Sequence, residues 1–180
     1  MAWTSPLTAV ANTTLTAAQW NIFLRDSLNA QGPTSATGAG QLLVTTGFGS
    51  LTMRTPQVQY ISTSDTTASS SLVALDSDGA EVTVITGTMC MVTVGCQISN
   101  STAGAGGMAS IDLFGDTERA ADEINCVRAD SGNANDAFKL GWTTIYNPIN
   151  PGSNTFGMKY RATGGGTASF AGRLIVAVPF

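Results

Sequence analysis

Histidine is absent from this 180-residue chain, and charged side chains make up only 11% of it. Without an imidazole, the chain cannot use a histidine base, a serine or cysteine triad of the usual kind, or a His-ligated metal. A typical soluble domain carries about 25% charged residues. Short neutral polar side chains and 20 glycines, rather than charged residues, therefore make up most of the solvated surface, which is typical of a β-rich domain. We expect no enzymatic turnover, no metal and no cofactor.

Basic residues are also few, with eight against 12 acidic ones, so the net charge is −4. Such a chain repels a phosphate backbone overall, and nucleic acid is not an expected partner. The first residues lack a basic segment, and no apolar run reaches about 18 residues, so neither a secretory signal nor a membrane span is predicted. We expect the chain to fold in a cytoplasm, as one domain of ordinary size plus an appendage.

The three cysteines, Cys90, Cys96 and Cys126, are an odd number without a C-x-x-C spacing. Neither a disulfide framework nor a zinc knuckle is therefore indicated. Cys90 and Cys96 fall on the same side of one expected strand, about 20 Å apart at roughly 3.3 Å per residue, which is too far for a bond. The interpretation is small buried hydrophobes in a reducing compartment, with a bond from Cys126 to one of the other two as the alternative.

The pattern predicts a single helix, near the N-terminus. Thr16 and Gln19 form a capping box, and the helix continues to about Gln31. Its apolar stripe consists of Ala17, Trp20, Phe23, Leu24 and Leu28, with Arg25 and Asp26 on the opposite side. A helix of about 15 residues is marginal alone, and no second helix is predicted to cover it. Residues 1–31 are therefore expected to form an anchoring arm that packs on another subunit or on a scaffold.

Residues 32–56 are expected to form a polar linker, Gly32–Gly40, followed by a short β-hairpin around Gly47-Phe48-Gly49. Apolar and polar residues alternate over much of 57–180. Strands are predicted at 57–62, 71–75, 81–86, 90–98, 107–114, 124–129, 137–147 and 154–162, and in a C-terminal strand where Phe170, Leu174, Val176, Val178 and Phe180 share one face. Many short strands without helical crossovers predict a mainly β chain, an antiparallel jelly-roll-like β-sandwich preceded by the short N-terminal α-helical arm.

Two N-terminal motifs carry a resemblance to a known group of proteins. The opening AWTSP and the following LTAAQWNIFLRDSLNA resemble the N-terminal signature of small structural proteins of tailed bacteriophages, particularly those infecting actinobacteria. The core of that motif falls on Asn21, Arg25, Asp26 and Leu28. The segment GQLLVTTGFGSLTMR is similar to one that recurs in phage tail and fibre proteins, with Gln41 in place of the usual acidic residue. Together the motifs cover about the first 55 residues.

The resemblance implies a virion structural protein, assembled in the host cytoplasm, whose β domain projects outward, often as a homotrimer. Such proteins are minor tail, fibre-like or capsid-decorating components, some of which attach to the host. We favour the tail, with a capsid decoration protein that stabilises the head shell as the alternative. The docking residues are expected to be Trp20, Phe23, Leu24, Arg25, Asp26 and Leu28, with Trp20 as the main buried anchor.

A homotrimer is also expected from the last strand. Leu174–Phe180 (LIVAVPF) contains apolar residues of both parities, which an exposed strand covered on one side would not need. Both faces of this strand should therefore be covered, one of them by another subunit.

Three further groups of residues have both a functional and a purely structural interpretation. Asp76, Asp78 and Glu81 could form a loose calcium loop, or only the hairpin turn at Asp78-Gly79. The carboxylates Asp112, Asp116, Glu118, Asp122 and Glu123 could hold a glycosidase pair, or form a solvated acidic loop. The aromatic residues Trp142, Tyr146, Phe156 and Tyr160 could stack on host cell-surface glycan, or pack in the core. A carbohydrate-active enzyme is thus a third function, which the lack of histidine and of any catalytic motif disfavours.

Overall fold

The computed structural model describes residues 16, 38–47, 50–75 and 79–180. Within them the chain forms eleven strands and no helix, and none of these residues belongs to a helix able to cross a membrane. Apart from Thr16, the predicted helical arm lies outside the described residues, as do Asp76 and Asp78 of the candidate calcium loop. The chain divides into two compact units, residues 1–53 and 54–180.

The first unit contains a two-stranded sheet. Strand β1 (Leu42–Gly47) pairs with β2 (Ser50–Arg54), whereas Phe48 and Gly49 of the predicted turn lie outside the described residues. Leu42 and Leu43 in β1 and Leu51 in β2 are exposed. An isolated two-stranded hairpin is marginally stable in water, so this sheet gains from any surface that covers its leucines.

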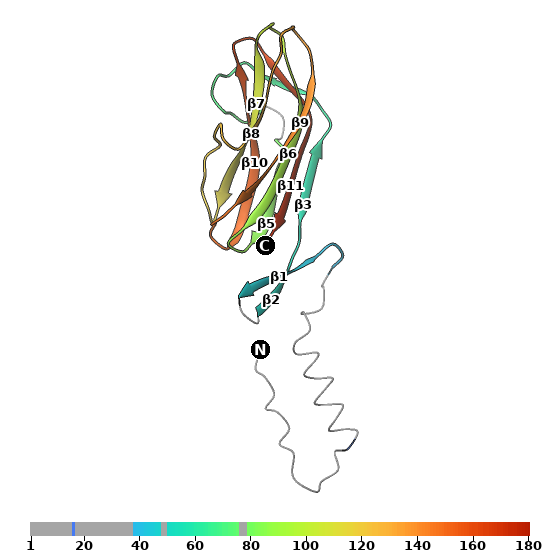
Figure 1. Cartoon of the computed structure of the whole chain (residues 1–180), viewed down its shortest axis with the longest axis vertical. Helices are drawn as coiled ribbons and strands as arrows, with labels where there is room; N and C mark the ends of the chain where they lie inside the picture. The colour runs from blue at the N-terminus through green and yellow to red at the C-terminus, as the bar shows by residue number, and fades with distance from the viewer. Residues whose placement is uncertain (1–15, 17–37, 48–49, 76–78) are drawn as a thin grey trace. The chain divides into compact units, whose positions relative to one another are not determined.

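The second unit consists of two antiparallel sheets packed face to face (Figure 1). The four-stranded sheet has the order β5-β10-β7-β8, and the five-stranded sheet has the order β3-β11-β6-β9 with β4 also paired to β11. The four-stranded sheet comprises β5 (Glu81–Thr86), β7 (Gly106–Gly115), β8 (Cys126–Asp130) and β10 (Gly152–Thr163). The five-stranded sheet comprises β3 (Gln57–Ile61), β4 (Asp65–Thr67), β6 (Cys90–Asn100), β9 (Phe138–Tyr146) and β11 (Ala168–Pro179).

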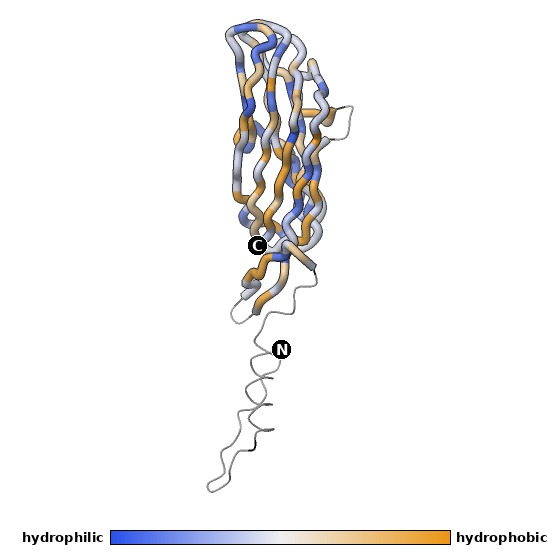
Figure 2. The backbone as a smooth tube through the Cα atoms, turned by 90° about the vertical axis from the view of Figure 1, so that its right-hand side faces the viewer, coloured by the Kyte–Doolittle hydropathy of each residue, from blue (hydrophilic) through white to orange (hydrophobic). Residues whose placement is uncertain are grey.

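The core lies between these sheets and follows the predicted alternation. In β6 the predicted inward face is confirmed, because Cys90, Val92, Val94, Cys96 and Ile98 are all fully buried. Apolar and polar residues alternate along several strands in Figure 2. Aromatic pairs join the sheets: the rings of Tyr146 and Phe156 are 5.3 Å apart and those of Tyr160 and Phe170 are 4.9 Å apart. Tilted pairs at such distances add to the stabilisation from burial.

The strand predicted at 71–75 was wrong. Only Val73 forms an isolated bridge there, to Tyr160, and a short strand, β4, appears upstream instead. The Ser69 hydroxyl donates to the Ser71 carbonyl and accepts from the Ser71 amide, which holds this segment in a turn. Serine side chains compete with a strand ladder in this way because they bond to the nearby backbone.

The prediction that Leu174, Val176 and Val178 share the inward face of the last strand with Phe170 was also wrong. The β11–β6 register shifts between Ala171 and Leu174, where Gly172 has a φ of 55°. A β-bulge inserts residues into one strand and so changes which side chains face inward. Phe170 faces the core before the bulge, and Arg173, Ile175 and Ala177 are buried after it. Leu174, Val176 and Val178 therefore face outward, where they are half-buried.

Candidate interaction surface

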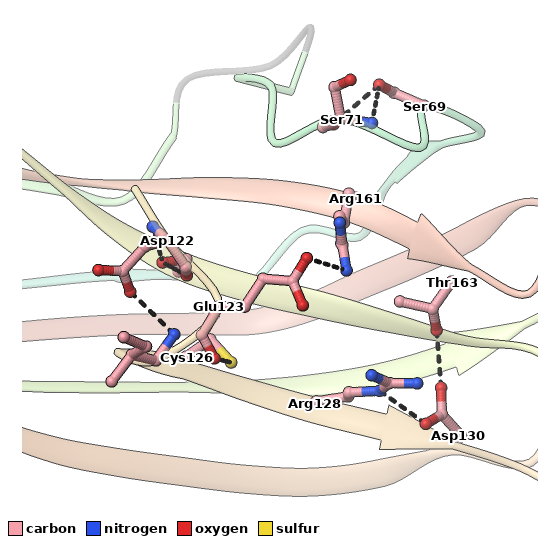
Figure 3. A network of polar contacts seen from close by, with 11 residues as sticks. Ser69, Ser71, Asp122, Glu123, Cys126, Arg128, Asp130, Arg161 and Thr163 are labelled. Carbon is pink, nitrogen blue, oxygen red and sulfur yellow. Dashed lines mark hydrogen bonds and ion pairs between the residues drawn. The ribbon is translucent and has the colours of Figure 1, made fainter. Parts of the chain in front are cut away.

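The outer face of the four-stranded sheet carries ion pairs. On this face Arg128 is 2.7 Å from Asp130 within β8, and Lys159 of β10 is 3.8 Å from Asp112 of β7. Arg161 of β10 is 2.7 Å from Glu123, in the loop before β8 (Figure 3). These residues alternate with core residues along their strands, so they lie on the solvent side. This face is charged and self-compensated, as expected of a surface that stays in water.

The Asp130 carboxylate is held by neighbours on two strands. It accepts hydrogen bonds from the Thr163 hydroxyl at 2.7 Å and from Arg128 at 2.7 Å (Figure 3). Burial raises the pKa of Asp130, but these two hydrogen bonds and the Arg128 charge outweigh it, so the pKa is lowered. The two hydrogen bonds therefore favour the charged form of Asp130, and the bond from Thr163 links β8 to β10.

The carboxylates around the connection between β7 and β8 accept backbone hydrogen bonds. Asp112 of β7 accepts from the Ala121 amide, Asp116 accepts from the Ser153 amide of β10, and Asp122 accepts from the Ile124 and Asn125 amides two and three residues on. Glu118 is exposed. Within the described part of the chain, no three His, Cys, Asp or Glu residues are grouped so that they could hold a metal ion. Asp122 thus caps a local turn, whereas Asp112 and Asp116 tie the connection to the neighbouring strands.

The outer face of the five-stranded sheet is different, because one half of it is apolar. Val58 and Tyr60 of β3 and Ile145 of β9 are 64%, 60% and 59% exposed. The strand register places half-buried residues of β11 and β6 between them on the same side. We call the whole set the outer-face patch; it comprises Val58, Tyr60, Met91, Ile145, Leu174, Val176 and Val178. None of these residues is charged, so nothing in the patch itself favours water.

The patch has a floor made of small residues. Gly95 of β6 lies directly opposite Gly141 of β9, and only backbone atoms of neighbouring strands come within 4 Å of a Cβ built at either glycine. In the adjacent row the Thr93 and Thr143 hydroxyls are hydrogen bonded at 2.9 Å. Two paired positions without side chains therefore lie beside Leu174.

A second apolar surface lies on the other side of β9. Phe138, Leu140 and Trp142 are paired with Ile98, Cys96 and Val94, which are fully buried, so the three residues lie on the core-facing side of the sheet. They are nevertheless 42%, 36% and 43% exposed. We call Phe138, Leu140 and Trp142 the edge row. The opposing sheet leaves it uncovered, because β8 has five residues and β9 has nine.

The edge row ends where the sandwich closes. The Thr144 hydroxyl donates to the Asn125 side chain at 3.0 Å, and Tyr146 is 5% exposed. Strand β9 pairs with β6 along one side and has no partner strand on the other within the described residues. Natural edge strands are normally shortened, charged or covered, and in β9 Lys139 is the one charged residue among nine.

The predicted glycan contacts separate into buried and exposed residues. Tyr146, Phe156 and Tyr160 lie in the core, where a ring cannot stack on a sugar, so the glycan interpretation was wrong for Tyr146 and Tyr160. Trp142 alone among these candidates is exposed. Tyr160 also packs against a buried arginine, since the Arg173 guanidinium lies 5.9 Å from its ring centroid. The docking residues Trp20, Phe23, Leu24, Arg25, Asp26 and Leu28 lie outside the described residues.

All three cysteines are free thiols, so the alternative of a bond from Cys126 was wrong. Burial raises the pKa of Cys90 and of Cys96 to about 12. Cys126 is partly exposed, and its S–H donates to the Glu123 carbonyl (Figure 3). Partial burial, followed by the charges of Glu123 and Asp122, raises its pKa as well. None of these thiols is activated as a nucleophile.

Sequence reasoning missed most of both apolar surfaces. Val58 and Tyr60 alternate with Gln57 and Gln59 in the strand predicted at 57–62, and such an alternation normally places the apolar residues in the core. In the structure Gln59 instead accepts a hydrogen bond from the Glu81 amide of β5, and the two apolar residues face solvent. The glutamines were the signal that could have revealed this orientation. A glutamine amide is long enough to hydrogen bond to the opposite sheet, so Gln57 and Gln59 can face inward while Val58 and Tyr60 face solvent.

No family model matches the chain, and no curated protein matches it. Among solved structures, infectious bursal disease virus of the Gx strain matches with 16% identity and a TM-score of 0.41, over 72% of this chain and 35% of that one. The VP2 subviral particle of the same virus matches with 17% identity and a TM-score of 0.39, over 72% and 35%. The chain thus spans about a third of the length of these neighbours.

Proposed function

We propose that this protein is a non-enzymatic structural component of a virion, and that its β domain associates with copies of itself as a homotrimer through the outer-face patch. The carrying observation is the contrast between the two outer faces of one sandwich. One has three ion pairs, such as Arg161–Glu123, and within its strands a single apolar residue that is more than half exposed, Ile85. The other has three such apolar residues, Val58, Tyr60 and Ile145, flanking half-buried apolar residues of β11 and β6. An exposed apolar surface of this kind marks an interaction site.

Strand order supports the finer assignment of the fold as a jelly roll. Apart from the short β4, which pairs with the start of β11, the strands β3, β6, β9 and β11 lie in one sheet and β5, β7, β8 and β10 in the other, and among these eight strands the chain changes sheet at every connection except β7–β8. The orders β3-β11-β6-β9 and β5-β10-β7-β8 place the last strand beside the first in one sheet. Two interleaved four-stranded sheets of antiparallel strands are the arrangement of a jelly roll, which viral capsid domains share with lectins.

The proposal of a non-enzymatic role rests on the chemistry of the carboxylates and thiols. Asp112, Asp116 and Asp122 each accept backbone amides, and the chain offers no histidine to serve as a base. The test is incubation with host cell-wall glycans followed by chromatography. Unchanged glycans are expected. Cleavage that is lost in Asp112→Asn or Asp116→Asn would contradict the proposal.

The location in the particle rests on the N-terminal motifs. Their resemblance to phage tail components favours a minor tail or fibre-like role, with residues 1–31 as the anchoring arm and possible adhesion to host glycan through the β domain. Trp20→Ala is expected to reduce incorporation into particles while leaving the β-rich circular dichroism unchanged. Incorporation at the wild-type level would show that the arm is not the anchor.

Antibody labelling of purified particles tests the virion role itself. An antibody against residues 54–180 should decorate the tail. Decoration of the head shell would replace the tail assignment by a capsid decoration protein, and an absence of the chain from particles by mass spectrometry would refute the virion role.

A further inference from the structure

The five-stranded sheet has two apolar surfaces that are not equivalent. The outer-face patch lies on the solvent side of β3, β11, β6 and β9, whereas the edge row lies on the core-facing side of β9 alone. A self-complementary contact about a two-fold axis uses the same surface on both subunits, and a ring of three needs two different surfaces that meet head to tail. The presence of two distinct surfaces fits the second arrangement.

We propose that neighbouring copies of this chain associate head to tail, with the edge row of one copy seated on the outer-face patch of the next. This inference rests on the proposed self-association and names the surfaces that carry it. The occupant of each surface is therefore a second copy of the chain, in which Phe138 and Trp142 contact the glycine floor at Gly95 and Gly141.

Complementary shape is the first support for this pairing. The edge row presents two large rings, and beside the outer-face patch Gly95 and Gly141 lie opposite each other without side chains, which leaves room for a ring. Leu174 lies beside Gly95 in the next strand, and Tyr60 lies beyond it. Aromatic side chains that insert into a recess lined by apolar residues are typical anchors of protein interfaces.

The available area is the second support. From the exposed fractions of Val58, Tyr60 and Ile145, the outer-face patch offers on the order of 400 Å², and the edge row offers about 300 Å². A standard interface buries about 1,600 Å² in total, of which roughly 900 Å² is apolar. Because a contact covers similar areas on its two partners, one head-to-tail contact buries on the order of 600 Å² of apolar surface, about two thirds of the apolar share of a standard interface. A face-to-face pair would leave the edge row of both copies in water.

The charge distribution is the third support. The outer-face patch, the edge row and the two floor glycines contain no charged residue themselves. Lys139 lies on the same face as the patch, opposite Gln97 and two residues from Gly141, so it borders the glycine floor, where its ammonium group can stay in water at the rim of a contact. Among the described residues, the ion pairs Arg128–Asp130, Lys159–Asp112 and Arg161–Glu123 lie on the outer face of the other sheet.

A complementation experiment with the full-length chain tests the inference. Trp142→Glu removes the edge row but keeps the outer-face patch, and Val58→Glu removes the patch but keeps the edge row. Each variant alone is expected to be monomeric by light scattering. When they are mixed, the intact edge row of Val58→Glu can contact the intact patch of Trp142→Glu, so a one-to-one heterodimer should form. Phe138→Glu and Tyr60→Glu serve as a second pair if circular dichroism shows that a first-choice variant does not fold.

The outcomes separate the inference from the proposed function. If Trp142→Glu alone dimerises, the patch contacts itself, and if Val58→Glu alone dimerises, the edge row contacts itself; either result overturns the head-to-tail arrangement while leaving self-association intact. A mixture that stays monomeric while the wild type associates also overturns it. A wild type that is monomeric at micromolar concentration refutes the self-association on which the inference rests.

Discussion

Two isoleucines provide a matched test of the outer-face patch. Ile145 lies in the outer-face patch on the edge strand β9, and Ile85 lies on the outer face of the other sheet in its edge strand β5. Both are 59% exposed, so their substitution should affect the folding of a single chain to a similar degree. We predict that Ile145→Glu weakens self-association strongly, whereas Ile85→Glu leaves it unchanged.

The magnitude follows from the area that remains to be covered. Full burial of an isoleucine side chain contributes roughly 1.5–3 kcal/mol, so covering the exposed 59% of Ile145 contributes about 1–2 kcal/mol to each contact. Placing a glutamate carboxylate there adds a desolvation cost. Since about 1.4 kcal/mol corresponds to a tenfold change in Kd, the variant should associate at least about tenfold more weakly.

The assay is light scattering over a concentration series from about 1 to 100 μM, which brackets the Kd of a moderately stable complex. Circular dichroism and a urea titration establish that both variants fold as the wild type does. Equal loss of association in Ile145→Glu and Ile85→Glu would show that surface charge alone disperses the protein. An Ile145→Glu variant that associates like the wild type would refute the assignment of the patch.

Three further predictions concern the fold. A thiol reagent at pH 8 should label Cys126 alone in the native protein and all three cysteines after unfolding, because Cys90 and Cys96 are buried with a pKa of about 12. Mass spectrometry counts the labels, and labelling of Cys90 in the native protein would contradict the packing. Gly106→Ala should lower the free energy of unfolding by about 1–3 kcal/mol in urea, because its Cβ would overlap the Ala129 carbonyl, whereas Gly132→Ala, where a Cβ meets nothing within 4 Å, should change it little. Asp130→Asn should destabilise the protein at pH 7, because the folded state holds the charged carboxylate through Thr163 and Arg128. Since the folded pKa of Asp130 lies below its ordinary value of 3.8, the advantage of the wild type should persist above that pH and disappear as the pH falls through the lowered pKa. Urea titrations at pH 7 and pH 3 that show the same difference in the free energy of unfolding would contradict these contacts.

Local alternation was sufficient to predict most strands, because it records burial on one side of a sheet. In the run from Cys90 to Ile98, every second residue is buried in the core, as the alternation predicts. The bulge in β11 could not be predicted in this way. Gly172 falls in register with its apolar neighbours in the sequence, and only the shift against β6 shows that the inward face changes there.

The candidate surface depended on long-range pairing that the sequence does not record. Trp142 and Tyr146 lie on the same side of β9, yet one is 43% exposed and the other 5%. The difference arises because the Asn125 loop closes the sandwich near Thr144, and the short β8 leaves the other end of β9 uncovered. The sequence showed apolar residues on both faces of the last strand, but it assigned Leu174, Val176 and Val178 to the inward face, and the structure places them on the outer one.

The mass of the full-length wild type in solution tests the central claim of self-association most directly. Sedimentation velocity at about 10 μM, a concentration in the range of a moderately stable complex, should give a species of about 56 kDa, three copies of the 18.5 kDa chain. A single species of 18.5 kDa across the accessible concentrations would contradict the account, because the outer-face patch and the edge row would then both remain in contact with water.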